Sequence, residues 1–167
     1  STQASPLLYD LTTLQREAYR VHRLGPSKTL QIAQKLYLDG LISYPRTSSQ
    51  KIPESIEPLK ILDKLKKHFS SAVKLVSRRV PVEGKKSDPA HPSTYPTGEH
   101  PELEAGAEPL YNLIVQRFIS TFCPDALLAN KRVVLTAKGN VTFTASGLKI
   151  LDKGWSAVYP ASFEEKD

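Results

Sequence analysis

Gly40-Leu41-Ile42-Ser43-Tyr44-Pro45-Arg46-Thr47-Ser48-Ser49 is the stretch around which the chain is arranged, because it sets a tyrosine, a proline and an arginine directly after an amphipathic segment. Proline disfavours the α conformation in the residue before it, so we expect Tyr44 to be extended. Side chains two residues apart share a face of an extended segment, which puts Arg46 on the side of the Tyr44 hydroxyl. A phenol nucleophile beside a planar, permanently charged guanidinium suits phosphoryl transfer.

The same residues have a plainer interpretation. Tyr precedes Pro at three positions, Tyr44-Pro45, Tyr95-Pro96 and Tyr159-Pro160. A Tyr-Pro-Arg turn without chemistry is common, and a motif this short is weak by itself. The local sequence therefore leaves both interpretations open.

Two predicted helices precede this stretch. Thr12-Thr13-Leu14-Gln15 matches a capping box and predicts a first helix that runs to about Arg23. Leu24-Gly25-Pro26 interrupts it, and Ser27 is the expected N-cap of a second helix that reaches about Leu38. With residues 41–44 as a short strand, the order is the helix-turn-helix-strand of a winged-helix module.

The rest of the chain predicts two more helices and then a change to strands. Residues 56–69 form an amphipathic pattern with a helix-like continuation to Val76, and residues 108–122 form the next predicted helix. Between them, residues 77–107 are rich in Pro, Gly and charge, as in functional or mobile loops. Three β-prone segments follow in the C-terminal part, at residues 132–137, 141–145 and 149–151.

Charge and composition restrict the class of partner. The net charge of +6 favours a polyanion such as nucleic acid, although a merely basic surface is the alternative. A single cysteine excludes an internal disulfide framework, and no run of 18 apolar residues or leader-like segment predicts a membrane span or signal peptide. The absence of methionine suggests that the sequence is cut from a longer polypeptide.

A second candidate site is the run Asp88-Pro89-Ala90-His91-Pro92-Ser93-Thr94-Tyr95-Pro96-Thr97-Gly98. A histidine fixed between prolines in a loop is well placed to meet a ligand, because the prolines reduce the freedom lost on binding. A solvated loop histidine is the alternative. The four histidines are not at metal-ligand spacing, so the sequence predicts no metal site.

The two motifs together resemble a known family. The block from Lys28 to Ile52, with Ser-Tyr-Pro-Arg-Thr inside it, resembles the active-site tyrosine segment of type IA DNA topoisomerases, of archaeal topoisomerase or reverse gyrase flavour. The run 88–98 is similar to that family's downstream histidine motif, and Gly154-Trp155 is similar to the Gly-Trp that ends a strand of its gate domain. Three ordered matches over nearly the whole chain are more specific than any one of them.

The resemblance implies a fold that is mainly α with a small β part. Residues 8–124 would be a winged-helix (CAP-like) domain that carries the tyrosine. Residues 1–7 are a lead-in at the end of the hinge domain, and residues 125–167 would be part of that β-rich hinge (gate) domain.

The resemblance also implies roles for individual residues. Tyr44 would attack a backbone phosphate of single-stranded DNA to give a transient 5′-phosphotyrosine link, with strand passage and religation to follow, while Arg46 and His91 contact the phosphate. The DNA-binding candidates are Lys28, Ser43, Thr47 and Thr97. The family commonly has Thr-Asp-Ser after the arginine, where this chain has Thr47-Ser48-Ser49.

The family holds Mg²⁺ with a glutamate and an Asp-x-Asp cluster, and this sequence has no Asp-x-Asp. The resemblance thus implies Mg²⁺ in the parent enzyme, bound by a domain absent from this chain, and none bound here. The implied partners are single-stranded DNA and the remaining parent domains, with no membrane, in a cytoplasmic, nucleoid-associated enzyme. The isolated chain is expected not to relax supercoils.

Two other classes of function remain as alternatives. A winged-helix DNA-binding regulator would read duplex DNA with the second helix and would not need Tyr44. A protein-interaction module would carry its charge incidentally and would lack a defined salt dependence of DNA binding.

Overall fold

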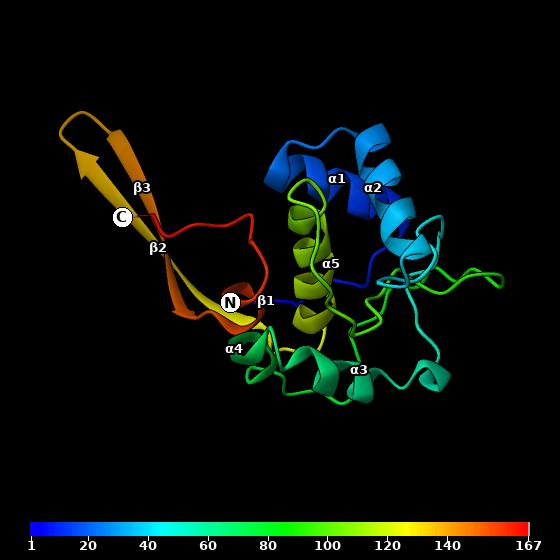
Figure 1. The fold of residues 1–167 in the computed structure, drawn as a ribbon. Helices are drawn as coiled ribbons and strands as arrows, with labels where there is room; N and C mark the ends of the chain where they lie inside the picture. Colours follow the sequence, from blue (N-terminus) through cyan, green and yellow to red (C-terminus); the bar gives the residue numbers. More distant parts are fainter. Residues whose placement is uncertain (167) are drawn as a thin grey trace.

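The computed structural model describes residues 1–166, within which five α-helices and three β-strands form a helical body and a projecting hairpin (Figure 1). Asp167, the last residue of the predicted hinge-domain segment, lies outside the described residues. The helices are α1 (Leu11–His22), α2 (Pro26–Leu38), α3 (Pro58–Leu65), α4 (Ser70–Val73) and α5 (Glu108–Ser120). Short 3-10 helices span Glu54–Ile56 and Gly154–Ala157, and the strands are β1 (Thr2–Gln3), β2 (Ala126–Ala137) and β3 (Val141–Asp152). The prediction of helices with a small antiparallel sheet is confirmed at this level.

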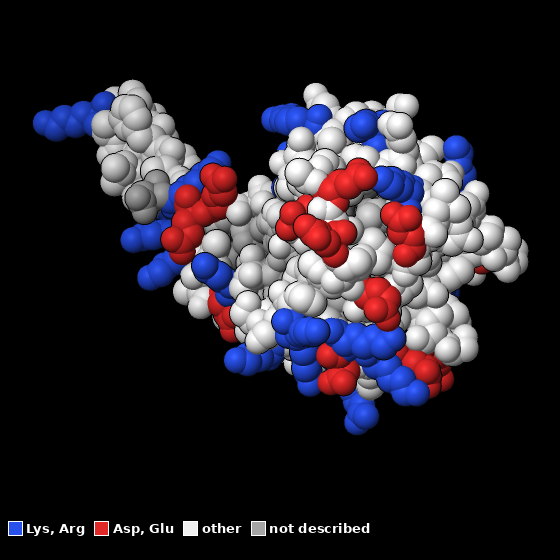
Figure 2. Space-filling view, viewed as in Figure 1, with Lys and Arg blue, Asp and Glu red and all other residues white. Residues whose placement is uncertain are grey.

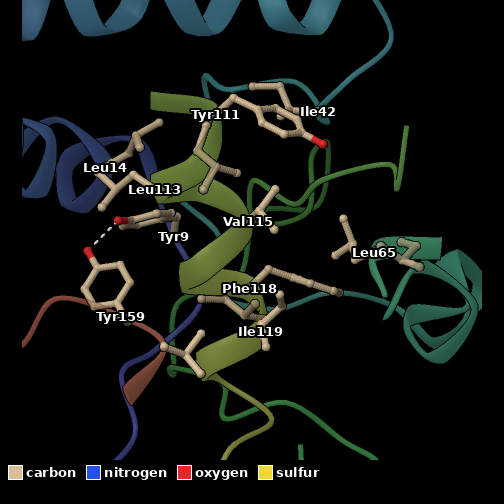
Figure 3. Close-up of a cluster of buried hydrophobic side chains, with 14 of the residues drawn as sticks. Tyr9, Leu14, Ile42, Leu65, Tyr111, Leu113, Val115, Phe118, Ile119 and Tyr159 are labelled. Atoms are coloured by element: carbon tan, nitrogen blue, oxygen red, sulfur yellow. Dashed lines mark hydrogen bonds between the residues drawn. The ribbon is translucent and has the colours of Figure 1, made fainter. Parts of the chain in front are cut away.

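Helix α5 forms the centre of the helical body, with α1 and α2 toward one of its ends and α3 and α4 toward the other (Figure 1). Its side chains are buried on nearly every face, which fits a helix surrounded by other elements rather than one on the surface. Figure 3 shows how α5 packs among its neighbours. The buried side chains drawn there include Leu14 from α1, Leu65 from α3, and Leu113, Val115, Phe118 and Ile119 from α5.

A polar cluster lies inside this otherwise apolar core. The hydroxyls of Tyr9 and Tyr159 are 2.6 Å apart (Figure 3), and the Tyr159 hydroxyl donates to Glu17 at 2.9 Å. The Arg117 guanidinium lies over the Tyr9 and Tyr159 rings, 4.6 and 5.0 Å from their centroids, and Arg20 donates to Glu17. This cluster joins α1, α5 and the segment that follows the hairpin.

The helices start at residues other than those predicted. Asp10, not Thr12, is the N-cap of α1, because its carboxylate accepts a hydrogen bond from the backbone N–H of Thr13 at 2.8 Å. Helix α2 begins at Pro26, in the first turn where a missing N–H is not needed, so Gly25 rather than Ser27 precedes it. The predicted ends of both helices agree within one residue.

The predicted helix 56–69 with its continuation is shorter and interrupted. Pro58 starts α3 as expected, and Glu57 before it adopts the left-handed conformation, at φ 55°. Helix α3 ends at Leu65, and the separate short helix α4 replaces the predicted continuation. The helix predicted over residues 108–122 is confirmed as α5.

The prediction of a strand at residues 41–44 is wrong. Ile42 forms only an isolated antiparallel bridge with Pro96. The bridge is flanked by hydrogen bonds from the Ser43 N–H to the Tyr95 carbonyl and from the Thr97 N–H to the Leu41 carbonyl. Pro45 would be the next donor if the ladder continued, and proline has no N–H to donate. Helices α1 and α2 are present as predicted, with only this bridge at the place where a strand was expected, and the winged-helix arrangement stays a prediction.

The C-terminal part is one long hairpin instead of three short segments. Strands β2 and β3 pair antiparallel from Leu127↔Asp152 to Ala137↔Val141, and β1 adds to the base of β2. Residues 146–148, which lie between two of the predicted segments, are part of β3, with Ser146 opposite Arg132 and Gly147 opposite Lys131. Pairing along β2 outweighs the weak local break at this glycine. Residues 138–140, between the first two predicted segments, form the turn of the hairpin, and Gly139 and Asn140 adopt positive φ there.

Candidate functional site

Tyr44 lies directly beyond the C-terminal end of α2. The helix is closed by Gly40 at φ 76°, a conformation that favours glycine, after which Leu41 and Ile42 are buried in the core. Tyr44 follows as a half-buried side chain at the surface. Because this pair is buried, it restricts the backbone directly before Tyr44.

Two other rings contact Tyr44. The His91 ring lies 4.6 Å from it, centroid to centroid, and the Tyr37 ring from the last turn of α2 lies 5.2 Å away at 69°. The structure thus brings Tyr44 together with His91, 47 residues along the chain, as the two motifs predicted. The Tyr37 contact was not predicted, although its position just before the helix-closing Gly40 was a usable signal.

Backbone hydrogen bonds hold the two motifs side by side. The Ser43 N–H donates to the Tyr95 carbonyl at 2.9 Å, and the Thr97 N–H donates to the Leu41 carbonyl at 3.0 Å. Ser93 donates its N–H to the Lys51 carbonyl at 2.8 Å. The long irregular region therefore returns to the tyrosine segment and is fixed there.

Side-chain hydroxyls add to this attachment. The Ser43 hydroxyl accepts from the Tyr95 N–H at 2.8 Å, and the Thr97 hydroxyl donates to the Gly40 carbonyl at 2.7 Å. The Thr47 hydroxyl donates to the His91 carbonyl at 3.1 Å. Contact of these three residues with DNA stays a prediction, and within the protein their hydroxyls join the two motifs.

Asp88 organises the start of the histidine loop. Its Oδ1 accepts from the N–H of Ala90 at 2.9 Å and from that of His91 at 3.4 Å, and its Oδ2 lies 3.4 Å from the Ser48 hydroxyl. The hydrogen bond from Ala90, which contributes most, lowers the pKa of Asp88 from its ordinary value of 3.8. The carboxylate therefore stays ionised near neutral pH. The Asp88 carboxylate lies beside Ser48, the position at which the resembled family commonly has an aspartate.

Arg46 and Lys28, the two cationic residues predicted for the site, differ in their distance from Tyr44. Arg46 is exposed and forms no salt bridge with any described residue, so its guanidinium is available to an anion. Lys28 is exposed in the first turn of α2, about 13 Å along the helix axis from Tyr37, so the structure does not gather it with Tyr44.

The lysines of α3 and the turn after it are largely paired with acids. Lys60 lies 2.8 Å from Glu57, and Lys66 lies 3.2 Å from Asp63. Figure 2 shows Lys and Arg gathered over the end of the molecule at which α3 lies, with acidic side chains among them. Exposed pairs of this kind are weak, and they reduce the net field that this group presents to a polyanion.

Metal ligands are not assembled in the described part of the chain. Residues 1–166 contain no group of three or more His, Cys, Asp or Glu side chains that could hold an ion. Within the same residues, no helix is long and apolar enough to cross a membrane.

Comparisons with known proteins identify the family of the chain. A family model described as DNA topoisomerase matches residues 1–167. The chain is 48% identical over 159 residues to DNA topoisomerase 1 of Methanothermobacter thermautotrophicus, covering 93% of this chain and 22% of that protein. It is 44% identical over 170 residues to DNA topoisomerase 1 of Pyrococcus horikoshii, covering 96% of this chain and 25% of that protein.

A solved structure shares the fold. Full-length topoisomerase I from Thermotoga maritima superimposes with a TM-score of 0.71 at 26% identity, covering 100% of this chain and 30% of that one. The chain thus spans a quarter or less of the length of these two archaeal relatives. Because a family model and close relatives match almost all of it, this chain belongs to the type IA DNA topoisomerase family.

Proposed function

We propose that this chain is the nucleophile-bearing part of a type IA DNA topoisomerase, in which Tyr44 attacks a backbone phosphate of single-stranded DNA. The observation that carries the proposal is the placement of Tyr44. Its half-exposed ring lies 4.6 Å from the ring of His91, with the exposed guanidinium of Arg46 two residues further along the chain. Family membership supports the same reaction class.

The proposed step is a transesterification. A bond forms between the Tyr44 phenol oxygen and phosphorus, and the bond from phosphorus to the 3′ oxygen of the preceding nucleotide breaks. The phenol loses its proton, and the released 3′ oxygen gains one. Because one phosphodiester replaces another, no outside energy is required, and the 3′ hydroxyl reseals the strand by the reverse step. A phenol, with an ordinary pKa of about 10, is a good enough leaving group for that reversal.

Arg46 and His91 are assigned to the phosphate. Arg46 supplies a fixed positive charge as negative charge builds on the non-bridging oxygens, and His91 does so when it is protonated. Lys28 is assigned to the DNA backbone away from the reacting phosphate, as its position along α2 suggests. Ser43, Thr47 and Thr97 are assigned to binding of the DNA next to the reacting phosphate.

The rest of the enzyme belongs to the same proposal. Residues 8–124 are assigned to a winged-helix-like tyrosine domain, and residues 1–7 and 125–167 to part of a β-rich hinge domain. Mg²⁺ is assigned to other domains of the parent, and no step is given to a metal held by residues 1–166. We expect those domains to be partners of this chain, in a cytoplasmic, nucleoid-associated enzyme, and the isolated chain not to relax supercoils.

Covalent trapping tests the proposal. The natural full-length polypeptide that contains these residues is mixed with Mg²⁺ and single-stranded DNA, and the reaction is stopped with detergent. DNA labelled at its 3′ end should give a protein-linked band, whereas DNA labelled at its 5′ end should give a shorter free fragment, because the link is to the 5′ phosphate. Tyr44→Phe should abolish the band.

Tyr37→Phe is the matched control. This phenol lies beside Tyr44, with ring centroids 5.2 Å apart, and makes no hydrogen bond through its hydroxyl to any described residue. The variant should therefore keep the band. A band that survives Tyr44→Phe, or no band with the unaltered protein, would contradict the proposal.

A further inference from the structure

The side-chain hydroxyl of Thr47 is hydrogen-bonded within the protein both as a donor and as an acceptor. Its hydroxyl donates to the His91 carbonyl at 3.1 Å and accepts from the Ser49 N–H at 3.0 Å. Only 6% of the residue is exposed. A hydroxyl whose donor and acceptor are both used inside the protein is poorly placed to bind a phosphate.

The backbone of Thr47 is held as firmly. Its carbonyl accepts from the Leu11 N–H at 2.9 Å, at the start of α1, and its own N–H donates to the Pro45 carbonyl at 3.0 Å. The tyrosine segment is thus anchored to the helical body at Thr47, three residues after Tyr44. A group that is hydrogen-bonded to Thr47 is therefore held in place relative to the helical body as well.

His91 is held from both sides of its backbone while its ring stays free of hydrogen bonds to described residues. Thr47 binds its carbonyl, and the Asp88 carboxylate binds its N–H at 3.4 Å. The half-exposed ring then lies 4.6 Å from that of Tyr44. The Thr47 bond is the better shielded of the two, because Thr47 is buried and the Asp88 carboxylate is reached by solvent.

We infer that Thr47 is a positioning residue, whose hydroxyl holds the His91 loop so that the imidazole meets the phosphate attacked by Tyr44. The inference rests on the proposed function, and it replaces a DNA contact of Thr47 with an action through His91. A direct DNA ligand would change affinity for DNA. A positioning residue changes the rate of the covalent step once DNA is bound.

The test compares two substitutions in the natural full-length polypeptide. Thr47→Val keeps the shape and removes the hydroxyl, whereas Thr47→Ser keeps the hydroxyl and removes a methyl group. The affinity for a single-stranded oligonucleotide is measured with Tyr44→Phe in each background, and the rate of covalent adduct formation is measured at saturating DNA. We expect Thr47→Val to slow the adduct about tenfold, the rate equivalent of one hydrogen bond, with affinity changed less than twofold. Thr47→Ser should retain the unaltered rate.

A double-mutant cycle asks whether the effect passes through His91. In a His91→Ala background, Thr47→Val should slow the adduct no further. An effect of undiminished size in that background, or a loss of affinity at an unchanged saturated rate, overturns the inference. Should Thr47→Val fail to fold, Asp88→Ala releases the other side of the same loop from a solvent-reached position and should slow the adduct without loss of affinity. An unchanged rate in that variant counts against the inference.

An activity-independent readout separates this inference from the proposed function. With ¹³C-labelled histidine, the ring resonance of His91, identified by its loss in His91→Ala, reports the nearby Tyr44 ring. Thr47→Val should shift that resonance, and Thr47→Ser should leave it in place. If the unaltered protein forms no adduct, the proposed function fails, while the resonance still decides whether Thr47 holds His91.

Discussion

At the scale of single residues, surroundings divide the tyrosines into those that can and cannot react. Tyr9 and Tyr111 are fully buried, and burial raises the pKa of Tyr9 and raises that of Tyr111 to about 12. Burial also raises the pKa of Tyr159, which is bonded to Glu17. Tyr44 differs because it is half-exposed at the surface and contacts a histidine ring. The greater exposure of Tyr44 thus favours it over these core tyrosines as the nucleophile.

Glu17 gives a pH-dependent prediction. Burial would raise its pKa, but hydrogen bonds from Arg20 and Tyr159 outweigh burial and lower the pKa below its ordinary value of 4.5. A lowered folded-state pKa means that the stabilisation is present above pH 4.5 and is lost as the pH falls through the folded value. Glu17→Gln should therefore reduce the free energy of unfolding by about 1–2 kcal/mol at pH 6, with the difference from the unaltered chain shrinking below pH 4. Urea unfolding at both pH values measures it, and a difference that grows on acidification would refute it.

At the scale of elements, residues 124–125 and 152–155 join the hairpin to the helical body. Gly154 adopts φ 51°, and an added Cβ would lie 2.6 Å from the Pro124 carbonyl oxygen and nearer still to that of Asp125. Trp155 donates its backbone N–H to Pro124 at 2.9 Å and its indole N–H to the Gln3 carbonyl at 3.0 Å. The Gly-Trp pair is thus explained by close packing rather than by chemistry.

Gly154→Ala should therefore destabilise the chain by about 3 kcal/mol, because the new methyl group meets backbone that cannot move aside and the positive φ is strained. Gly106→Ala is the matched control, since an added Cβ there meets no atom within 4 Å. Thermal unfolding of the two variants compares them. Equal melting temperatures would show that the junction is looser than the structure indicates.

Elements formed by local sequence patterns could be predicted, whereas features that depend on contacts between distant residues could not. Periodic apolar residues were enough for α5, and the paired motifs were enough to place His91 near Tyr44. The starts of α1 and α2 were missed because more than one residue near each start is an acceptable N-cap by type, and the sequence alone does not show that Asp10 and Gly25 occupy the N-cap positions. Strand β3 was broken in prediction at Gly147, since cross-strand pairing with Lys131 is not visible locally. The ties made by Thr47 and Asp88 depend on loop geometry that no periodicity encodes.

At the scale of the whole molecule, the hairpin projects away from the helical body (Figure 1). Its outer part exposes apolar side chains, among them Val134 at 52%, Leu135 at 63% and Phe143 at 59%. Only its base is buried, through Ala126 and Leu128. The stability of the helical body should consequently depend little on the outer hairpin.

Replacement of residues 132–146 by an Asn-Gly turn should therefore change the free energy of unfolding by less than about 1 kcal/mol, as expected for exposed segments. Trp155→Ala, at the buried base, should cost about 3–5 kcal/mol. Urea unfolding monitored by helical circular dichroism checks both. A large loss on shortening the hairpin would mean that its outer part supports the helices.

The central claim is that Tyr44 becomes linked to DNA, and peptide mapping of the trapped adduct tests it most directly. Trypsin releases residues 36–46 as one peptide that carries both Tyr37 and Tyr44, so fragmentation of that peptide must assign the linked residue. We expect a nucleotide 5′-phosphate on Tyr44 and an unmodified Tyr37. A nucleotide on Tyr37 or on any other residue would contradict it.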